Sequence, residues 1–437
     1  MIKKINVYGG GLAGCETAYQ LLKRGFDVTM YEMKRLKKSP AHKLDTLCEL
    51  VCSNSLKSED IGTASGLLKA EMQMLDSLIL TTAQECKVPA GNALAVDRDL
   101  FSKKITDKLN SFTNFTYIDC VATNFLPKED EISVVATGPL TDEALIPAFE
   151  ECFGNDFLYF FDAVAPIVTT DSIDFESAFV ASRYNKGDAD YVNCPMTKDE
   201  FLTFWQNLVD AETVEIKDFE NNVFEGCMPI EVMAKRGVDT IRFGPLKPVG
   251  LYDDRKPGEK FYAVLQLRKE NVEGTLYNLV GFQTHLKFGE QKRVFSMIPA
   301  LKNAEFVRYG VMHRNTYINA PKFLNSSFQL KSNPNVYFAG QVTGVEGYME
   351  SAASGLVVAI QIANRLNSLP SVDFTGKTIL GALSKHVSTE FGNYSPMNSN
   401  FGILESLDKV VKDKSLKKKM YADRSLAVMS EVVKNIK

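Results

Sequence analysis

The stretch Gly9-Gly10-Gly11-Leu12-Ala13-Gly14 decides the fold of this chain. It follows residues 5–8, a short β-branched run that predicts a buried strand. Residues 12–24 then place apolar side chains at helical spacing, and Gly25 marks the end of that helix. A glycine-rich turn between a strand and a helix is the setting in which this pattern predicts binding of a dinucleotide cofactor.

The glycines of this turn have separate physical roles. Gly9 allows the tight turn, Gly11 lets the backbone approach a pyrophosphate, and Gly14 lets the helix pack close to the strand. The free N–H groups at the start of the helix attract the phosphates. A second predicted strand, residues 26–31, ends at Glu32, and we expect this carboxylate to hold ribose hydroxyls.

A second strand-to-helix junction lies near the other end of the chain. Residues 335–339 read as a strand that ends at Gly340, and Gln341 opens a glycine-rich stretch that includes Gly347 and leads into the next predicted helix. An NAD-dependent dehydrogenase usually needs one such junction, whereas the longer FAD molecule often contacts two. We therefore predict an α/β fold with a Rossmann-like FAD-binding domain that is split in sequence.

The composition is that of a soluble globular protein, because 45% of the 437 residues are hydrophobic and 24% are charged. The net charge of −4 provides no overall basic field, so an RNA partner would have to bind local basic patches. The chain starts directly with a strand rather than a secretory signal, and no apolar run is long enough to span a membrane. Eight scattered cysteines without CxxC pairs predict reduced thiols, no metal site and a cytoplasmic location.

The rest of the chain predicts an insertion between two parts of the cofactor domain. We expect residues 1–185 and 319–437 to form the split FAD-binding domain, the second part ending in helices. Residues 186–318 lack a second glycine fingerprint and contain alternating runs such as 262–267, which predicts an inserted α+β domain. The other elements expected in the first part are helices at 67–80 and 100–110 and strands at 115–121 and 132–136.

Two basic segments allow more than one interpretation. Residues 32–38 read EMKRLKK, and this basic stretch straight after the acid suits either a solvated loop or contact with phosphates of a cofactor or RNA. Lysines near the C-terminus lie on a predicted helix and suit either a solvated face or a phosphate-binding patch; they are Lys412, Lys414, Lys417, Lys418 and Lys419.

The thiols also leave alternatives open. Cys48 and Cys52 are four residues apart and could share a helix face as a redox pair, although a buried thiol is the commoner fate of a cysteine. Cys227 lies in the inserted domain, in a turn set by Gly226 and Pro229. That turn could present a reactive thiol, or it could simply bury one.

Longer motifs identify a family. In chain order they are GGGLAG (9–14), YEM (31–33), SPAH (39–42), ELVCSNSL (49–56), SRYNKG (182–187), NCPM (193–196), FEGCMPIEVMAKRG (224–237), IRFGP (241–245), NLVGFQT (278–284), EQKRVF (290–295), YGVMHRNT (309–316), FAGQVTGVEGYMESAASG (338–355) and PMNSNFG (396–402). With these motifs along nearly all its length, the chain resembles the folate- and FAD-dependent uracil-5-methyltransferases of RNA. The large flavoprotein of tRNA wobble-uridine modification shares the glycine junctions.

The resemblance implies that 5,10-methylenetetrahydrofolate supplies a carbon to C5 of a uridine in structured RNA, either tRNA or 23S ribosomal RNA. It implies reduced FAD as the hydride donor and NAD(P)H as the reductant of the flavin. It assigns Cys227 as the thiolate that adds to C6 and Cys52 as the base for the C5 proton. It also suggests His313 for stacking on the folate pterin, while we expect a structural role for Cys194.

The chain departs from the family pattern at two positions. Cys48 stands where the family usually has a small residue, and His285 where it often has Asn, so neither receives a role. Two other function classes stay open: an NAD(P)H-dependent flavin oxidoreductase without an RNA substrate, and a non-catalytic flavin-binding RNA chaperone. Nothing in the sequence predicts the oligomeric state.

Overall fold

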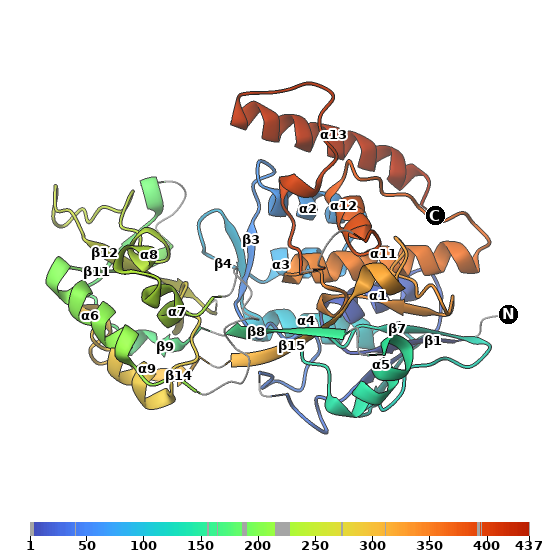
Figure 1. Cartoon of the computed structure of the whole chain (residues 1–437), viewed down its shortest axis with the longest axis horizontal. Helices are drawn as coiled ribbons and strands as arrows, with labels where there is room; N and C mark the ends of the chain where they lie inside the picture. The colour runs from blue at the N-terminus through green and yellow to red at the C-terminus, as the bar shows by residue number, and fades with distance from the viewer. Residues whose placement is uncertain are drawn as a thin grey trace.

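The computed structural model describes residues 4–39, 41–154, 157–163, 165–185, 190–214, 228–271, 274–310, 312–390, 394 and 396–436. These residues form two parts with separate hydrophobic cores, joined by a two-stranded ribbon (Figure 1). The helices are α1 (Leu12–Leu22), α2 (Ala64–Gln73), α3 (Leu78–Glu85), α4 (Arg98–Asn110), α5 (Ile146–Phe153), α6 (Lys198–Asp210), α7 (Ile230–Lys235), α8 (Val238–Phe243), α9 (Phe288–Phe295), α10 (Ala320–Phe323), α11 (Tyr348–Leu366), α12 (Ile379–His386) and α13 (Lys414–Lys434). The strands are β1 (Lys4–Tyr8), β2 (Val28–Glu32), β3 (Ser55–Ser58), β4 (Lys87–Val88), β5 (Ala93–Val96), β6 (Phe115–Asp119), β7 (Glu131–Val135), β8 (Phe157–Ala163), β9 (Ile167–Thr169), β10 (Phe179–Ala181), β11 (Tyr191–Met196), β12 (Ala263–Lys269), β13 (Leu276–Leu279), β14 (Phe306–Arg308), β15 (Met312–Ile318) and β16 (Val336–Phe338).

The larger part is built on a parallel sheet of five strands in the order β16-β7-β1-β2-β6. Val7 in the middle strand lies opposite Met30 on one side and Val134 on the other, and all three side chains are buried. Burial on both faces is typical of parallel sheets. The expected α/β, Rossmann-like fold is therefore confirmed. Its sheet is split in sequence, because β16 joins it from far along the chain.

Helices α1 and α11 pack directly against each other. The Thr17 hydroxyl donates to the Gly355 carbonyl oxygen at 3.0 Å. A Cβ atom on Gly355 would lie 2.3 Å from the Ala13 carbonyl oxygen, so this crossing requires glycine. The contact fixes the spacing between the two helices that follow the two glycine junctions.

The single helix expected at residues 67–80 is wrong, because the chain forms α2 and α3 instead. Asp76 between them has a φ of 57°, a left-handed conformation that cannot continue a helix. Ser77 then caps α3 with its side chain, and Glu16 on α1 accepts two backbone N–H groups of the first turn of α3. A tertiary contact thus starts a new helix where apolar periodicity alone suggests continuation.

The inserted part contains a six-stranded antiparallel sheet in the order β10-β11-β12-β13-β9-β14. Residues of α6, α7, α8 and α9 share its hydrophobic core. The antiparallel ribbon β8–β15 links this part to the larger one (Figure 1). Strands β9 and β10 belong to the inserted sheet, so that sheet begins at Ile167, ahead of the expected domain start at residue 186.

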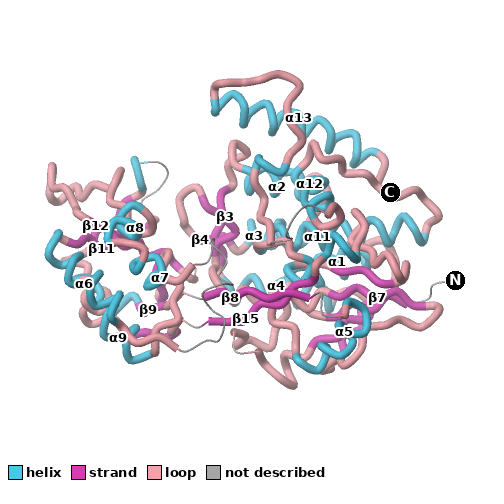
Figure 2. The backbone as a smooth tube through the Cα atoms, in the orientation of Figure 1, coloured by secondary structure: helices cyan, strands magenta, loops and turns pink. Residues whose placement is uncertain are grey.

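The C-terminal helices attach to the larger part through one buried carboxylate. Glu71 on α2 accepts the backbone N–H groups of Ile379 and Leu380 at 2.8 and 2.9 Å and the Ser425 hydroxyl at 2.5 Å. It therefore joins α2, α12 and α13, and Figure 2 shows α13 running over the other two. Within the described residues, no helix is long and apolar enough to cross a lipid bilayer.

Candidate active site

A cavity opens at the carboxyl edge of the parallel sheet. The ends of four neighbouring strands line it, through Tyr8 and Gly9, Tyr31 and Glu32, Ala136 and Thr137, and Gly340 and Gln341. Ligands of open α/β sheets bind at this edge. The lining includes seven of the residues that we expected to bind a cofactor: Gly9, Gly11, Leu12, Ala13, Glu32, Gly340 and Gln341.

The glycines of the first junction have two different roles: three of them are needed for the turn and its packing, and one borders open space. Gly9 has a φ of 104°, and a Cβ atom on Gly14 would lie 1.9 Å from the Gly9 carbonyl oxygen. Gly10 also packs inward, since a Cβ atom there would lie 2.4 Å from a methyl carbon of Leu47. A Cβ atom on Gly11 would have no neighbour within 4 Å, although Gly11 lines the cavity. The backbone at Gly11 is therefore open to a ligand.

Glu32 at the end of β2 holds the first turn and also lines the cavity. One carboxylate oxygen accepts the Gly10 backbone N–H at 2.5 Å, and the other accepts the Lys34 backbone N–H at 2.9 Å. An ionised carboxylate has about four acceptor positions. Glu32 can therefore accept a ligand hydroxyl while it keeps both backbone contacts.

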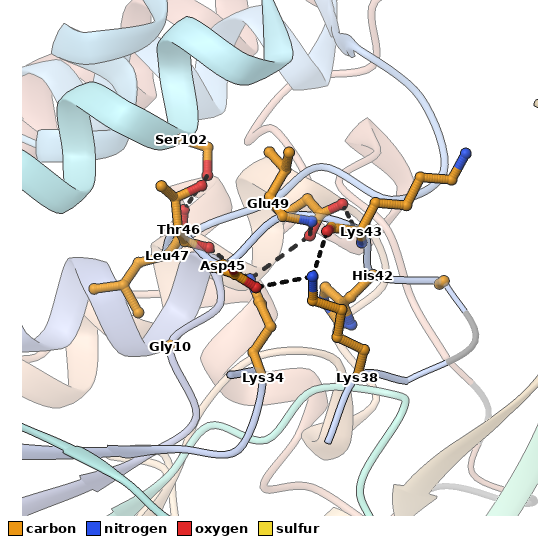
Figure 3. A network of polar contacts seen from close by, with 12 residues as sticks. Gly10, Lys34, Lys38, His42, Lys43, Asp45, Thr46, Leu47, Glu49 and Ser102 are labelled. Atoms are coloured by element: carbon orange, nitrogen blue, oxygen red, sulfur yellow. Dashed lines mark hydrogen bonds and ion pairs between the residues drawn. The ribbon is translucent and has the colours of Figure 1, made fainter. Parts of the chain in front are cut away.

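Lys34, in the basic segment after Glu32, lines the cavity and belongs to a network of polar contacts (Figure 3). Lys34 is only 4% exposed, and its ammonium group donates to the Thr46 carbonyl at 2.8 Å and lies 3.8 Å from the Glu49 carboxylate. Lys38 donates to the Lys43 carbonyl at 2.7 Å. Lys34 is thus neither a solvated side chain nor one that an RNA phosphate can reach.

The second glycine junction approaches the same cavity. Gly340 has a φ of 82°, and its N–H group donates to the Ser354 hydroxyl at 2.7 Å. Gly347 does not line the cavity; it has a φ of 120°, and a Cβ atom there would lie 2.2 Å from a Glu350 carboxylate oxygen. Gly347 instead shapes the start of α11, where the next residue, Tyr348, does line the cavity.

Cys52 lies half-buried in a loop, residues 50–54, that is held by side chains from four elements. The contacts are Arg98 to the Leu50 carbonyl (2.9 Å), Arg308 to the Val51 carbonyl (2.6 Å), the Cys52 and Ser53 N–H groups to the Tyr348 hydroxyl (2.7 and 3.1 Å), and Arg268 to the Asn54 and Ser53 side chains (2.9 and 2.7 Å). Two of these side chains, Arg268 and Arg308, belong to the inserted part. Both parts of the molecule therefore build the loop that carries this thiol.

The surroundings of the Cys52 loop are strongly polar although they are buried. Arg98 pairs with Glu270 across the two parts, with 2.7 Å between its Nε and the carboxylate. Burial, followed by the charge of Cys52, raises the pKa of the Tyr348 phenol, which therefore stays protonated at neutral pH. Val51 and Tyr348 both line the cavity, so the thiol loop lies at its rim.

Two other thiols are enclosed by the protein. Cys48 is buried with a φ of 57°, and burial raises its pKa. The chain between Cys48 and Cys52 is irregular, so the suggestion that they share a helix face is wrong. Cys194 is buried in β11, and burial raises its pKa, which suits the structural role expected for it.

Two predicted site residues lie beyond what the structure describes. Cys227 is outside the described residues, and for His313 only the backbone, in β15, is described. On either side of the segment that contains Cys227, the backbone is hydrogen-bonded to residues 283–285 of the inserted part. Val214 N–H donates to the His285 carbonyl at 2.9 Å, and Ile230 N–H donates to the Gln283 carbonyl at 2.8 Å.

Sequence reasoning missed Tyr348, Arg98 and Arg308. Tyr348 was within reach, because it follows Gly347 in the second glycine-rich stretch. The two arginines have no local signal, since each meets the Cys52 loop only through the tertiary fold.

The comparisons with known proteins agree with this architecture. Residues 4–370 match the family model described as GIDA, Glucose inhibited division protein A. The Acetivibrio thermocellus protein named methylenetetrahydrofolate--tRNA-(uracil-5-)-methyltransferase TrmFO is 54% identical over 435 residues, which are 99% of each chain. The protein of the same name from Bacillus licheniformis is 50% identical over 438 residues, which are 100% of each chain.

The solved structure of Aquifex aeolicus GidA in its form II crystal is similar to this chain with a TM-score of 0.70 at 15% identity. The match covers 98% of this chain and 73% of that one, and it shows that the fold is shared. The family model and the full-length identities together fix the relationship. The chain belongs to the GIDA family and, within it, to the group of proteins named TrmFO.

Proposed function

We propose that this protein methylates C5 of a uridine in tRNA in the cytoplasm, with 5,10-methylenetetrahydrofolate as the carbon donor and reduced FAD as the hydride donor. The observation that carries the proposal is the identity of 50–54%, over essentially the full length, to proteins named for that reaction. We favour the T-loop uridine of tRNA as the target and keep a 23S ribosomal RNA uridine as the second candidate. NAD(P)H is the proposed reductant of the flavin.

The residues of the cavity fit FAD. Gly11 leaves the backbone open at the start of α1, where a helix N-terminus favours a pyrophosphate. Glu32 can accept ribose hydroxyls, and Gly340 and Gln341 approach from the second junction. The bound flavin would supply the hydride that converts a methylene group at C5 into methyl. His313 stays our candidate for the folate site.

The thiols supply the covalent and proton-transfer steps of this proposal. The Cys227 thiolate adds to C6 of uracil, which forms a C–S bond and leaves C5 nucleophilic enough to attack the methylene carbon of the folate. The Cys52 thiolate, on the loop at the cavity rim, then removes the C5 proton. Loss of that proton lets the bond between the methylene carbon and the folate nitrogen break, which releases tetrahydrofolate. A later elimination breaks the C–S bond and regenerates Cys227. The proposed domain division places these thiols on the inserted and cofactor domains respectively.

The test is incubation of the purified protein with methylenetetrahydrofolate, NAD(P)H and unmodified tRNA or 23S rRNA fragments, with mass spectrometry of the RNA. Methylated uridine in tRNA supports the proposal, and methylation only of the rRNA fragment would shift the target. A protein that oxidises NAD(P)H but leaves both RNAs unmodified would contradict the proposal and favour a flavin oxidoreductase.

Cysteine variants test the assigned roles with RNA that contains 5-fluorouridine. Cys227→Ala should abolish both methylation and the covalent adduct, because addition to C6 needs that sulfur. Cys52→Ala should abolish turnover and still permit the adduct, since proton removal follows addition. Cys194→Ala serves as the matched control, with lower stability and retained chemistry. If only Cys52→Ala blocks the adduct, the two roles are reversed.

A further inference from the structure

Two sequence motifs, residues 182–187 and 241–245, play no part in the cavity or in the Cys52 loop. The structure joins their described residues on the inserted part. The Arg183 guanidinium donates to the Lys247 carbonyl at 3.0 Å, just after the second motif. The backbone N–H of Tyr184 donates to the carbonyl three residues beyond Lys247, at 2.6 Å. One surface therefore contains both motifs.

Aromatic rings in these two joined segments, and just after the second, face solvent. Tyr184, Phe243 and Tyr252 are 54%, 60% and 59% exposed. Among the described residues, all five exposed aromatic side chains belong to the inserted part, and the other two are Phe175 and Phe288. Large apolar groups that a folded part leaves in water mark an interaction surface.

The ring of Tyr184 is held in place before any ligand arrives. Tyr184 has a φ of 59°, a strained conformation for this residue type. Its ring covers Gly250, where a Cβ atom would lie 2.7 Å from the ring atoms. One face of the ring thus packs on backbone, so the side chain presents its exposed area in a fixed orientation.

Positive charge accompanies the rings. Arg183 is fixed by Gln266 of β12 at 2.9 Å, and within the described part of the chain neither Arg183 nor Lys247 is in an ion pair. Arg242 lies over the rings of Phe243 and Tyr262, at 4.8 and 4.1 Å from their centroids, and is 3.6 Å from Asp239. The two segments therefore combine exposed aromatic rings, of which that of Tyr184 is held against Gly250, with two cations that form no ion pair within the described residues.

We propose that Tyr184, Phe243 and Tyr252 form a platform on which unpaired bases of the RNA substrate stack, with phosphates held by Arg183 and Lys247. The inference rests on the proposed function, because it describes how the same substrate is bound. Every base has a face that can stack on an aromatic ring, and single-stranded loops expose those faces whereas a duplex hides them. The platform therefore selects RNA with an unpaired loop.

Direct binding measurements test the platform. Fluorescence anisotropy with an unmodified tRNA transcript should show that Tyr184→Ala, Phe243→Ala or Tyr252→Ala raises Kd about 5- to 150-fold, the range for loss of one base–ring stack. Tyr184→Phe keeps a ring and should bind like the wild type. Phe288→Ala is the matched control, because Phe288 is 55% exposed and stacks on Tyr309 elsewhere on the inserted part.

Salt and competition test the remaining features. Lys247→Met should reduce the slope of log Kd against log salt by about 0.7, the value for one phosphate of a single strand. A single-stranded oligouridine should displace tRNA from the wild type, and a blunt duplex of equal length should compete poorly. Flavin absorbance should not change in any variant, because these residues lie outside the cofactor cavity.

Failure of the platform is distinguishable from failure of the proposed function. If a Tyr184→Ala/Phe243→Ala variant binds tRNA with the wild-type Kd while the wild type methylates tRNA, the platform is wrong and the function stands. A wild-type protein that neither binds nor methylates RNA would contradict both the platform and the proposed function. If the substitutions alter only self-association in sedimentation, the surface is a protein contact and the proposal is wrong.

Discussion

The attachment of the C-terminal helices to Glu71 predicts a specific dependence of stability on pH. Burial raises the pKa of this carboxyl from 4.5 to about 7, although hydrogen bonds from Ser425, Ile379 and Leu380 oppose the rise. The folded protein therefore keeps a proton that the unfolded chain releases at lower pH. This contribution to stability is present below the unfolded pKa and is lost as pH rises through the folded pKa.

The magnitude follows from the shift in pKa. Between pH about 4.5 and about 7 the folded state holds up to one extra proton, so the free energy of unfolding falls by about 1.4 kcal/mol per pH unit. The total over the interval is about 3 kcal/mol. Between pH about 5.5 and about 8.5, the Glu71 carboxyl alone should remove about 2 kcal/mol.

Urea unfolding followed by circular dichroism measures this loss. Glu71→Gln keeps an acceptor oxygen and does not titrate, so the wild type should lose about 2 kcal/mol more than this variant from pH about 5.5 to about 8.5. Glu71→Ala instead leaves two buried backbone N–H groups of α12 without an acceptor, at about 1–3 kcal/mol each and at every pH. Equal pH slopes for the wild type and Glu71→Gln would refute the reasoning.

Further predictions concern the cavity and the Cys52 loop. Gly11→Val should strip the flavin, seen as loss of yellow absorbance, while the apoprotein keeps its thermal midpoint, because nothing lies within 4 Å of the new Cβ atom; a Gly11→Val protein with full flavin would contradict this. Gly14→Ala should lower the thermal midpoint itself, since its Cβ atom would lie 1.9 Å from the Gly9 carbonyl oxygen. Tyr348→Phe removes the acceptor of two N–H groups in the Cys52 loop and should slow methylation in a kinetic assay without changing the Kd for tRNA, and an unchanged rate would show that the loop does not need this contact. Arg98→Met leaves the buried Glu270 carboxylate without its ion-pair partner and should lower the free energy of unfolding in urea by about 3–5 kcal/mol. The double variant Arg98→Met/Glu270→Met should recover most of that stability.

The elements that the sequence predicts well are those fixed by local physics. The first strand, glycine turn and helix follow from short-range periodicity and from close contacts within the turn, such as Gly14 against Gly9. The helix expected at residues 67–80 was wrong because Glu16, far away in sequence, stabilises a new helix start. The inserted sheet begins at Ile167, ahead of residue 186, because β9 and β10 pair with strands that come later in the chain.

The site was predicted less completely than the fold. Seven of the expected cofactor residues line one cavity, because the glycine patterns mark backbone that must approach a ligand. Lysine is usually a surface residue, and only the fold reveals the Thr46 carbonyl and the Glu49 carboxylate that contact the buried Lys34 ammonium group. The exposed rings of the inserted part have no periodicity, so sequence alone could not separate them from core aromatics.

The contacts that hold the Cys52 loop, residues 50–54, have a consequence for how the protein is made. A ribosome releases the chain in order, so the Cys52 segment emerges long before Arg268, Arg308 and Tyr348 exist as side chains. The Val51 carbonyl has no final partner until Arg308 has left the ribosome, and the Cys52 and Ser53 N–H groups have none until Tyr348 has followed. The thiol near the beginning of the chain is thus among the last groups to be set in place, and a truncated chain cannot present it correctly.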